Sequence, residues 1–374
     1  MIFLDNASTT KVYDEVLDVY NKYSKELFFN PSAQYKCSSF VKQDITKTEK
    51  NILKFINAPI NSKLIFTSCA TESNNMAILC SLNKRFKKVL ISVGEHSSVY
   101  NLAQEITNRG YQVEYINLQQ DGKVDIQDLK NKMTSEVGVV AIMHVSNETG
   151  AINDIEQLVK IVKEVNPLCH FHCDGVQAIC KINVDVKKLN VDTYTFSGHK
   201  IHAPKGIAGL YVKNKISPLL IGGGQQNGLR SGTENVPGIM SLNKAIELTK
   251  ISNCFEYVKE LNTSAREILS SCDGITINSA LDNSPYILSI SMRGVNGSTI
   301  VDMLDDYDIC IGLGSACSTK KAGNVTLEAM GKNNADILGS VRISFSADNT
   351  INEVKEACNR LIECYKKLKT MLRK

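Results

Sequence analysis

The sequence has no tryptophan, only 7 prolines and 6% aromatic residues among its 374 residues. It also lacks any apolar run of about 18 residues, the minimum for a membrane-spanning helix. The first residues, MIFLDNASTT, do not combine a basic start with an apolar run and a cleavage site, so we expect no signal peptide. Membrane-spanning and secreted proteins are therefore not the expected classes.

A strong charge of one sign is missing as well, because 43 Lys and Arg residues against 39 Asp and Glu residues leave a net charge of +4. This excess is too weak to indicate a nucleic-acid-binding protein, and part of it lies in the tail YKKLKTMLRK, which is typical of a solvated helix face. Cysteine, by contrast, is plentiful, with 12 residues. Without a signal peptide we expect reduced thiols in the cytoplasm, most of them in the core.

What the chain does contain is an alternation of β-rich runs and helix-length segments between about residue 63 and residue 212. The expected strands cover residues 63–68, 88–93, 111–118, 137–145, 170–175, 192–198 and 206–212. Helix-length segments lie between most of them, over residues 71–86, 97–109, 125–135 and 153–165. The pattern predicts an α/β domain with a mostly parallel, seven-stranded sheet between helices. The last two strands are too close in sequence for a helical crossover, which predicts that they are antiparallel.

The character of the sequence changes after about residue 250. Two strand-like runs, 275–278 and 286–292, are followed by a helical stretch, 298–307, a loop rich in glycine and serine, and a third run at 342–346. The chain ends in an expected amphipathic helix whose apolar face consists of Ile351, Val354, Leu361, Tyr365, Leu368 and Leu372. We therefore expect a second, smaller α+β domain, with the boundary within residues 240–265.

Three segments that follow expected strands carry polar residues, and ligands collect at this edge of a parallel sheet. TSCATESNN (67–75) spans the turn from a strand into a helix, whose free amide groups and dipole suit a phosphate, with Thr71 as a further donor. HCDGVQ (172–177) places Asp174 and Gln177 at the same edge. Both segments predict polar groups that face one ligand.

The third segment, SGHK (197–200), ends in Lys200 and also contains Ser197 and His199. A lysine in this place can form a Schiff base, because desolvation and neighbouring cations lower its pKa. Each segment alone has a more ordinary explanation, such as a helix cap, a capping aspartate or a lysine that leaves the sheet for solvent. Together they supply the lysine, the carboxylate and the phosphate site that a pyridoxal 5'-phosphate (PLP) enzyme requires.

A metal site is another interpretation of this region, since Cys169, His170, His172 and Cys173 are possible ligands. Residues that alternate along a strand point to opposite faces. The two histidines therefore share one face and the two cysteines the other. Because the four side chains do not converge, we predict no metal site.

The segment GLGSACST (312–319) contains Cys317 and is followed by Lys320 and Lys321. Its glycines and serines predict an exposed loop, and nearby cations favour the thiolate form of a cysteine. The other cysteines are better explained as small core residues. Cys317 is therefore predicted to be the reactive thiol.

Several short motifs now stand in a specific order along nearly the whole chain. They are LDNASTT (4–10), NPSAQ (30–34), FTSCATESNN (66–75), EHSSV (95–99), SNETG (146–150), HCDGVQ (172–177), SGHKIHAPKG (197–206), GGGQQNGLRSGTENVP (222–237), GSACS (314–318) and VRISFS (341–346). On these motifs the chain resembles the cysteine desulfurases of the NifS/IscS type, in the class V aminotransferase fold group of PLP enzymes. The resemblance implies an aspartate aminotransferase-like PLP-transferase fold, with a large cofactor-binding domain over residues 13–250. Residues 1–12 and 251–374 would form the small domain that carries the catalytic cysteine.

The resemblance also implies roles for matching residues. Lys200 is similar to the lysine that holds the cofactor and moves the substrate's Cα proton, and Asp174 to the partner of the pyridinium nitrogen. Gln177 is similar to the residue that binds the ring hydroxyl, and His96 to the catalytic histidine that stacks on the ring and shuttles protons. The remaining cofactor-binding residues implied by the resemblance are Ala70, Thr71, Ser197, His199 and, from a second subunit, Thr233.

For the substrate, the resemblance implies L-cysteine, with Asn147 and Arg342 holding its carboxylate; the arginine fork suits this geometry. Cys317 is similar to the nucleophile that takes the substrate's sulfur as a persulfide and leaves alanine. The implied partners are a second copy of the chain, through Thr233, and a sulfur acceptor for iron–sulfur cluster assembly or for thiolation of tRNA or cofactors. We expect no membrane and no direct nucleic-acid partner. Cluster scaffolds, tRNA-thiolation enzymes and thiamine-pathway carriers remain open as acceptors.

A few positions depart from the usual pattern of the family. Cys69 and Ala203 stand where glycine is common, Ser146 replaces an asparagine, and Gly312 and Leu313 replace serines. If the backbone at position 69 requires a positive φ, Cys69 is strained there. These departures bear on substrate preference more than on the class of reaction.

Three other functions fit part of the pattern. A selenocysteine lyase could use the same site geometry, and a class V aminotransferase could use the same cofactor, although it needs no cysteine such as that in GSACS. A non-catalytic sulfur or iron–sulfur scaffold would use the cysteines as ligands, but the intact Lys200 and Asp174 argue against it. The yellow colour of bound PLP separates an enzyme from a scaffold.

Overall fold

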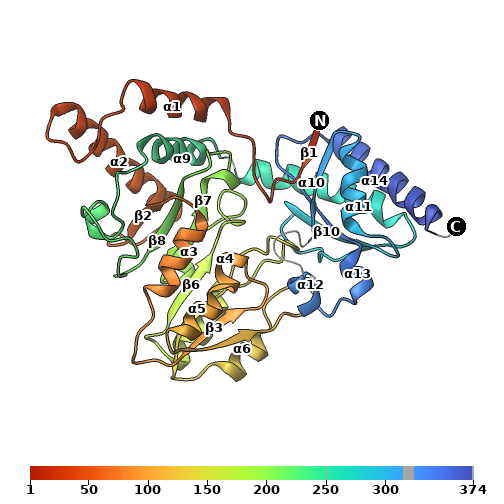
Figure 1. Cartoon of the computed structure of the whole chain (residues 1–374), viewed down its shortest axis with the longest axis horizontal. Helices are drawn as coiled ribbons and strands as arrows, with labels where there is room; N and C mark the ends of the chain where they lie inside the picture. Colours follow the sequence, from red (N-terminus) through yellow and green to blue (C-terminus); the bar gives the residue numbers. More distant parts are fainter. Residues whose placement is uncertain (250, 315–323, 373–374) are drawn as a thin grey trace.

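The computed structural model of the chain describes residues 1–249, 251–314 and 324–372. It contains two β-sheets, a seven-stranded one on the left of Figure 1 and a five-stranded one on the right. The N-terminus lies beside the five-stranded sheet, and the chain then crosses to the seven-stranded one. The predicted site residues come mainly from the ends of strands in the larger sheet.

The larger sheet has the strand order β2-β8-β7-β6-β5-β3-β4. Its strands are β2 (Lys63–Thr67), β3 (Lys88–Ser92), β4 (Gln112–Ile116), β5 (Val137–Ala141), β6 (His170–Asp174), β7 (Thr193–Ser197) and β8 (Ala208–Val212). All seven predicted strands are present, and the mostly parallel sheet is confirmed. β8 is antiparallel to β7, as predicted, and also to β2. Consequently β2, β6 and β7 end at the same edge of the sheet.

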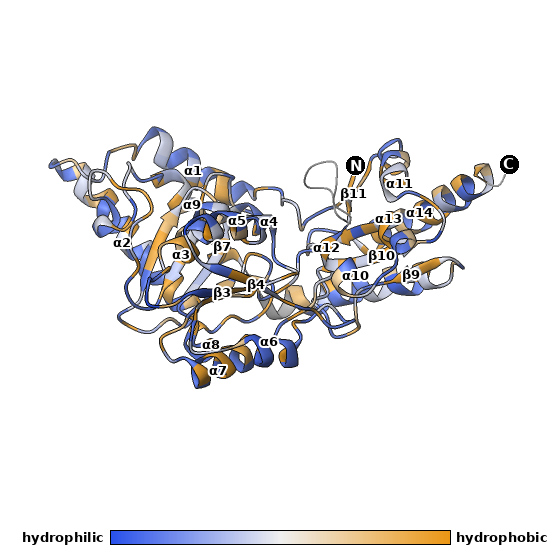
Figure 2. Cartoon of the chain, turned by 60° about the horizontal axis from the view of Figure 1, so that its bottom comes forward, coloured by the Kyte–Doolittle hydropathy of each residue, from blue (hydrophilic) through white to orange (hydrophobic). Residues whose placement is uncertain are grey.

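Helices cover both faces of this sheet because side chains along each strand alternate between two apolar cores. In β5, Val139 and Ala141 face one core and Val140 faces the other. The first core includes residues of α3 (Ala70–Leu79), α4 (Ser97–Tyr100) and α5 (Leu102–Asn108). The second includes residues of α2 (Lys36–Phe55), α6 (Ile126–Lys132), α7 (Ile155–Val165), α8 (Val186–Leu189) and α9 (Val236–Leu248). Figure 2 shows the resulting mixture of hydrophobic and hydrophilic sides on these helices.

The four predicted helix-length segments are helical, with different boundaries. α6 and α7 lie within the expected ranges, whereas α3 ends at Leu79, well before residue 86. The expected helix over 97–109 is divided at Asn101 into α4 and α5. None of the helices in the described parts of the chain is long and apolar enough to cross a membrane.

The smaller sheet has the strand order β1-β11-β12-β10-β9. Its strands are β1 (Ile2–Leu4), β9 (Ile275–Ile277), β10 (Ile287–Met292), β11 (Ile309–Leu313) and β12 (Ser340–Ser344). Three of these strands were expected from the sequence, but β1 and β11 were not. β11 overlaps the start of the stretch that was predicted to be a loop. The glycines of that stretch favoured a loop in the prediction, although a short apolar strand is present. β1 is an edge strand that pairs in parallel with β11.

The smaller sheet has a core of its own. Leu4 of β1 lies in this core with residues of α10 (Ile251–Ser270), α11 (Gly297–Asp305) and α14 (Ile351–Met371). The other helices of the described chain are α1 (Asp14–Lys25), α12 (Val325–Ala329) and α13 (Asn334–Leu338). On this basis we propose the predicted division into a large domain, 13–250, and a small domain made of 1–12 and 251–374.

The C-terminal helix α14 is amphipathic, as predicted. Val354, Leu361 and Tyr365 of its expected apolar face are buried. Leu372 is 64% exposed, so its predicted place on the buried face is wrong, because the helix ends one residue earlier. At the other end, Thr350 and Glu353 form a capping box, in which each side chain accepts a hydrogen bond from the other residue's backbone N–H.

The cap predicts a measurable loss of stability. Thr350→Ala should lower the free energy of unfolding by about 1 kcal/mol, because it leaves a first-turn N–H without its acceptor. Thr370→Ala in the last turn of the same helix is the matched control and should change this value by less than about 0.5 kcal/mol. Urea denaturation followed by circular dichroism measures both, and equal effects of the two substitutions would contradict the capping role.

Candidate active site

The residues predicted to bind the cofactor follow the ends of β2, β6 and β7. Asp174 is the last residue of β6 and lies opposite Thr195 of β7. Lys200 ends a short 3-10 turn, Gly198–Lys200, directly after β7. α3 begins at Ala70, shortly after β2 ends. The sheet topology therefore brings together the three segments that the sequence keeps far apart.

Asp174 is almost completely buried. Its Oδ2 accepts a hydrogen bond from Asn74 Nδ2 at 2.7 Å, and its Oδ1 accepts one from the backbone N–H of Val176 at 3.0 Å. Burying an ionised carboxylate is unfavourable unless hydrogen bonds compensate for the lost water. The two donors fix Asp174 as an acceptor, and its remaining lone pairs can receive a ring N–H.

His96 is the N-cap residue of α4. Its Nδ1 accepts a hydrogen bond from the backbone N–H of Ser98 at 3.1 Å and lies 2.9 Å from Ser98 Oγ. The preceding residue, Glu95, is buried, and its Oε1 accepts from the backbone N–H of Met143 at 2.6 Å. Burial and the nearby charge of Asp174 raise the pKa of Glu95 well above its usual range. The position of His96 is thus fixed by the hydrogen bond of its ring to Ser98 and by the buried hydrogen bond of the preceding residue, Glu95.

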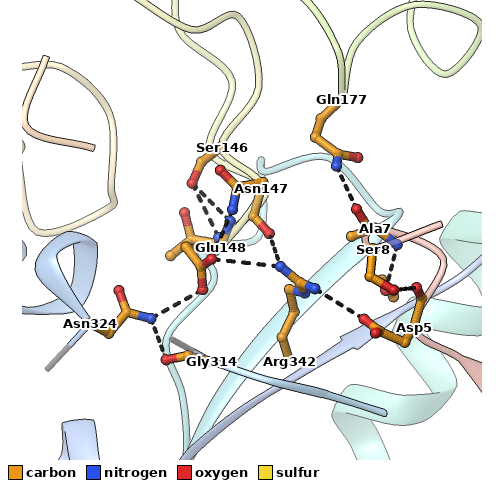
Figure 3. A network of polar contacts seen from close by, with 12 residues as sticks. Asp5, Ala7, Ser8, Ser146, Asn147, Glu148, Gln177, Gly314, Asn324 and Arg342 are labelled. Atoms are coloured by element: carbon orange, nitrogen blue, oxygen red, sulfur yellow. Dashed lines mark hydrogen bonds and ion pairs between the residues drawn. The ribbon is translucent and has the colours of Figure 1, made fainter. Parts of the chain in front are cut away.

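Lys200 and Gln177 contact the N-terminal segment that follows β1. Lys200 Nζ donates to the carbonyl oxygens of Ala7 and Ser8, both at 2.6 Å. Gln177 Nε2 donates to the same oxygen of Ala7 at 2.9 Å, as Figure 3 shows. On the far side, Lys181 Nζ donates to Gln177 Oε1 at 2.6 Å. The Gln177 amide is therefore held at both ends.

Lys181 is a buried amine, with its Nζ 5.8 Å from the ring centre of Tyr286. Burial, and the charges of Lys200 and Arg342, lower the pKa of Lys181 to about 7. Like charges in a poorly solvated place disfavour the protonated form. Lys181 consequently changes its charge near neutral pH, beside the predicted cofactor-binding lysine.

The turn from β2 into α3 presents an open helix N-terminus. The side chain of the N-cap residue, Cys69, makes no capping hydrogen bond, and its backbone is extended, with φ −165° and ψ 166°. The backbone at Cys69 therefore does not have the positive φ that would strain a cysteine, because any residue adopts this extended conformation. Thr71 is exposed in the first turn. These amide groups and the Thr71 hydroxyl are suitably placed for an anion.

The other predicted phosphate ligands belong to two further segments, the end of β7 and the segment before α9. His199 Nδ1 is 3.2 Å from Thr9 Oγ1, and burial followed by the charges of Lys200 and Lys205 lowers the pKa of His199 to about 4. His199 is therefore neutral at pH 7 and would bind a phosphate through a hydrogen bond and not through charge. Ser197 is buried at the end of β7. Thr233 is exposed in the segment before α9, and its predicted contact with a second subunit stays a prediction.

Arg342 of β12 stands between two carboxylates (Figure 3). Its Nη2 donates to Asp5 Oδ1 at 3.0 Å, its Nη1 donates to the backbone oxygen of Asn147 at 2.9 Å, and Glu148 Oε1 lies 3.6 Å from Nη1. The guanidinium is buried, and within the described parts of the chain its Nε has no hydrogen-bond partner. Arg342 is thus held by a carboxylate and a backbone carbonyl from two separate segments of the chain.

Glu148 connects this arginine to a second part of the small domain. Its Oε1 accepts from Asn147 Nδ2 at 2.8 Å, and its Oε2 accepts from Asn324 Nδ2 at 3.1 Å. Asn324 Nδ2 also donates to the backbone oxygen of Gly314 at 2.5 Å. The predicted nucleophile, Cys317, lies outside the described residues, between Gly314 and Asn324, and stays a prediction.

The remaining departures from the family pattern cause no strain. Ser146 Oγ accepts from the backbone N–H groups of Glu148 and Thr149, both at 3.3 Å, so the serine caps this turn. Ala203 is fully buried and has no positive φ. A Cβ at Gly312 would lie 2.6 Å from Asp5 Oδ1, so this glycine leaves room for the pair of Asp5 and Arg342. Nothing in the structure explains Leu313.

The possible metal ligands point to opposite sides of β6, as predicted. His170 and His172 both contact Thr193 Oγ1 at 2.9 Å, whereas Cys169 and Cys173 lie in the main core. Within the described ranges, no group of three His, Cys, Asp or Glu residues is arranged to hold a metal ion. The alternation along the strand accounts for this divergence.

Several residues of the site were missed by the sequence analysis. Asn74, Lys181, Glu148 and Asp5 each bind a predicted site residue directly. Asn74 and Asp5 lie inside recognised motifs, and Glu148 follows Asn147 in another. Sequence position alone did not show which of these side chains turn inward, because their partners belong to other elements.

The sequence model of the aminotransferase class-V family matches residues 2–356, so the chain belongs to the class-V aminotransferase family. A cysteine desulfurase of Nostoc sp. is 34% identical over 375 residues, which covers 97% of this chain and 93% of that protein. A solved NifS-like protein has a TM-score of 0.92 and 31% identity, covering 98% of this chain and 100% of that one. The structure "SspA in complex with cysteine" has a TM-score of 0.83 and 27% identity, covering 94% and 100%. The predicted kinship with cysteine desulfurases and the predicted fold are confirmed.

Proteins of this family depend on PLP, and the residues described above fit that group. Asp174 offers a buried carboxylate with free lone pairs, and α3 offers an uncapped helix start at the same sheet edge. Lys200 follows β7 at this edge, and the amide of Gln177 lies beside it at Ala7. Four parts of PLP therefore have a suitable group in this chain. Asp174 suits the ring nitrogen, the start of α3 suits the phosphate, Lys200 suits the aldehyde carbon and Gln177 suits the ring hydroxyl.

Lys181 predicts a specific pH dependence of stability. Its pKa falls to about 7 in the folded protein from an ordinary 10.5, so between these values the unfolded chain binds more protons and the free energy of unfolding rises with pH. Replacing it with an uncharged residue, Lys181→Met, should reduce the slope by up to about 1.4 kcal/mol per pH unit. Urea denaturation at several pH values from 7.5 to 9.5 measures the slope, with exposed Lys205→Met as the control. An unchanged slope in Lys181→Met would contradict the lowered pKa.

Proposed function

We propose that the chain is a PLP-dependent cysteine desulfurase that converts L-cysteine to L-alanine and takes the sulfur on Cys317 as a persulfide. The observation that carries this proposal is the convergence of Lys200, Asp174 and the open start of α3 at one sheet edge, with Arg342 facing it from the smaller sheet. Membership of a family that contains cysteine desulfurases supports it.

Bound PLP supplies an electron sink that weakens the bonds at the Cα of an amino acid. Around it, the residues of this chain have separate tasks. Asp174 would accept a hydrogen bond from the ring N–H, and Gln177, held by Lys181, would donate one to the ring hydroxyl. The amides of the first turn of α3, with Ala70, Thr71, Ser197 and His199, would bind the phosphate. With the ring held in this way, Lys200 Nζ would be placed to take and return the proton at Cα.

On the substrate side, Arg342 and Asn147 hold the carboxylate of L-cysteine and orient its Cα–H bond. The thiolate of Cys317 attacks the substrate's sulfur, so that an S–S bond forms while the Cβ–S bond breaks. A proton then goes to Cβ, with His96 as its proposed carrier, and alanine is released. Enzyme thiol plus cysteine thus gives enzyme persulfide plus alanine, with no external oxidant or reductant.

The proposed setting is a homodimer in the cytoplasm. The exposed Thr233 is available to the phosphate site of a second copy. The eleven described cysteines are all free thiols, which fits a reducing compartment. The persulfide would be delivered to a protein acceptor for iron–sulfur cluster assembly or for thiolation of tRNA or a cofactor.

Cys317→Ser tests the nucleophile. The variant should release no sulfide from cysteine in the presence of a reducing thiol, because a serine hydroxyl cannot form a persulfide. It should keep the yellow colour of the bound cofactor. Cys37→Ser, at an exposed cysteine, is the control and should keep full activity. A fully active Cys317→Ser variant would rule out the persulfide mechanism.

Lys200→Ala tests the attachment of the cofactor. Borohydride reduction of the intact protein should fix PLP covalently to the wild-type chain, and peptide mass spectrometry should place it on Lys200. The alanine variant should show no such adduct, while Lys205→Ala, at an exposed lysine nearby, should retain it. Covalent cofactor in the Lys200→Ala variant would contradict the assignment.

A further inference from the structure

A continuous series of hydrogen bonds runs behind the proposed cofactor site. It begins at His170 Nε2, which lies 2.9 Å from Thr193 Oγ1. The same oxygen lies 2.9 Å from Nδ1 of His172. His172 Nε2 in turn lies 3.0 Å from Asn74 Oδ1. His172 and Asn74 are both 0% exposed, so bulk solvent does not reach their side chains.

Asn74 is the branch point of this series. One N–H of its amide donates to Asp174 Oδ2 at 2.7 Å, and the other donates to Ser98 Oγ at 2.8 Å. Ser98 Oγ lies 2.9 Å from Nδ1 of His96. A single side chain of α3 is therefore bonded directly to Asp174, proposed to lie at the nitrogen of the cofactor ring, and through Ser98 to His96, proposed to lie on its face.

The directions of these bonds follow from the chemistry of the groups. An ionised carboxylate only accepts, so the amide nitrogen of Asn74 must face Asp174 and its oxygen must face His172. That oxygen also only accepts, so Nε2 of His172 must carry the proton. Burial and the neighbouring His170 lower the pKa of His172 to about 3, so its ring is neutral and Nδ1 accepts from the hydroxyl of Thr193.

The second branch determines the state of His96. The Ser98 hydroxyl accepts from Asn74, so its own proton is directed at Nδ1 of His96. The backbone N–H of Ser98 donates to the same nitrogen at 3.1 Å. With two donors directed at it, Nδ1 of neutral His96 carries no proton, and Nε2 carries it instead.

We propose that Asn74 is a positioning residue that makes Asp174 a fixed acceptor for the ring nitrogen and holds His96 in its Nε2–H tautomer, and that His172 keeps the Asn74 amide in the required orientation. This inference rests on the proposed function, because Asp174 and His96 need these states only if PLP binds between them. With the amide reversed, its oxygen would face the Asp174 carboxylate, and two acceptors would oppose each other in a buried place.

The first test needs no substitution. The full-length protein loaded with PLP is labelled with nitrogen-15 histidine, and long-range proton–nitrogen spectra report which ring nitrogen carries the proton. The chain has 6 histidines, and single His→Gln substitutions assign their signals. Nε2–H tautomers are expected for both His96 and His172 at pH 7.5. An Nδ1–H tautomer at either residue would overturn the proposal.

The second test compares two substitutions at His172. His172→Gln retains a side-chain N–H donor for Asn74 Oδ1, whereas His172→Phe removes it. The phenylalanine variant should lose the single His96 tautomer and require roughly tenfold to a hundredfold more PLP for half-saturation, because the bond to the Asp174 carboxylate loosens. The glutamine variant should stay within about threefold of the wild type. Equal PLP requirements of both variants and the wild type would overturn the proposal.

Asn74→Ala should show the same two changes directly. Asn75→Ala is the matched control, because this neighbour donates to the backbone oxygens of Thr71 and Ser98 and not to Asp174. Unchanged PLP binding and an unchanged His96 tautomer in Asn74→Ala would overturn the proposal. If Asn74→Ala does not fold, the wild-type tautomers and the His172 pair still decide it. A wild-type protein that binds no PLP would contradict the proposed function instead, while the tautomers could still be read in that protein.

Discussion

The hydrogen bond between the amide of Asn74 and the buried carboxylate of Asp174 is the interaction on which the rest of the site depends. A carboxylate without water is unfavourable unless donors surround it, and here one donor comes from α3 and another from the backbone after β6. The bond therefore ties the helix that offers its N-terminus to the strand that offers the carboxylate. The proposed phosphate site and the proposed ring site are held at one fixed separation for that reason.

The first residues of the chain form the other constraint. β1 pairs with β11 in the smaller sheet, yet the carbonyl groups of Ala7 and Ser8 bind Lys200 at the edge of the larger one. Asp5, between them and β1, holds Arg342. The N-terminal segment thus joins the lysine proposed for the chemistry to the arginine proposed for the substrate. A three-residue strand is sufficient for this task because its partner strand, β11, belongs to the core of the smaller sheet.

The sequence predicted an element correctly where the residues of that element alone carry a clear secondary-structure pattern. The seven strands of the large sheet were predictable because they are runs rich in β-branched and aromatic residues, most of them separated by helix-length segments. β1 and β11 were missed because each is short and lies beside turn residues, so only pairing with another strand stabilises it. Whether Cys69 is strained was left conditional on a positive φ, and the extended backbone there, a property that residue type does not reveal, shows that the condition is not met.

The sequence by itself determined the α/β class, the family and the kinds of group in the candidate site, since the motifs carry a lysine, a carboxylate, an arginine and a cysteine predicted to be reactive in a specific order. Tertiary structure alone decided which further side chains serve them. Asn74 and His172 are separated by 98 positions along the chain, yet they share a hydrogen bond 3.0 Å long. Their protonation and orientation depend on burial and on partners from four elements, α3, α4, β6 and β7, which come together only once the sheet and its helices have packed.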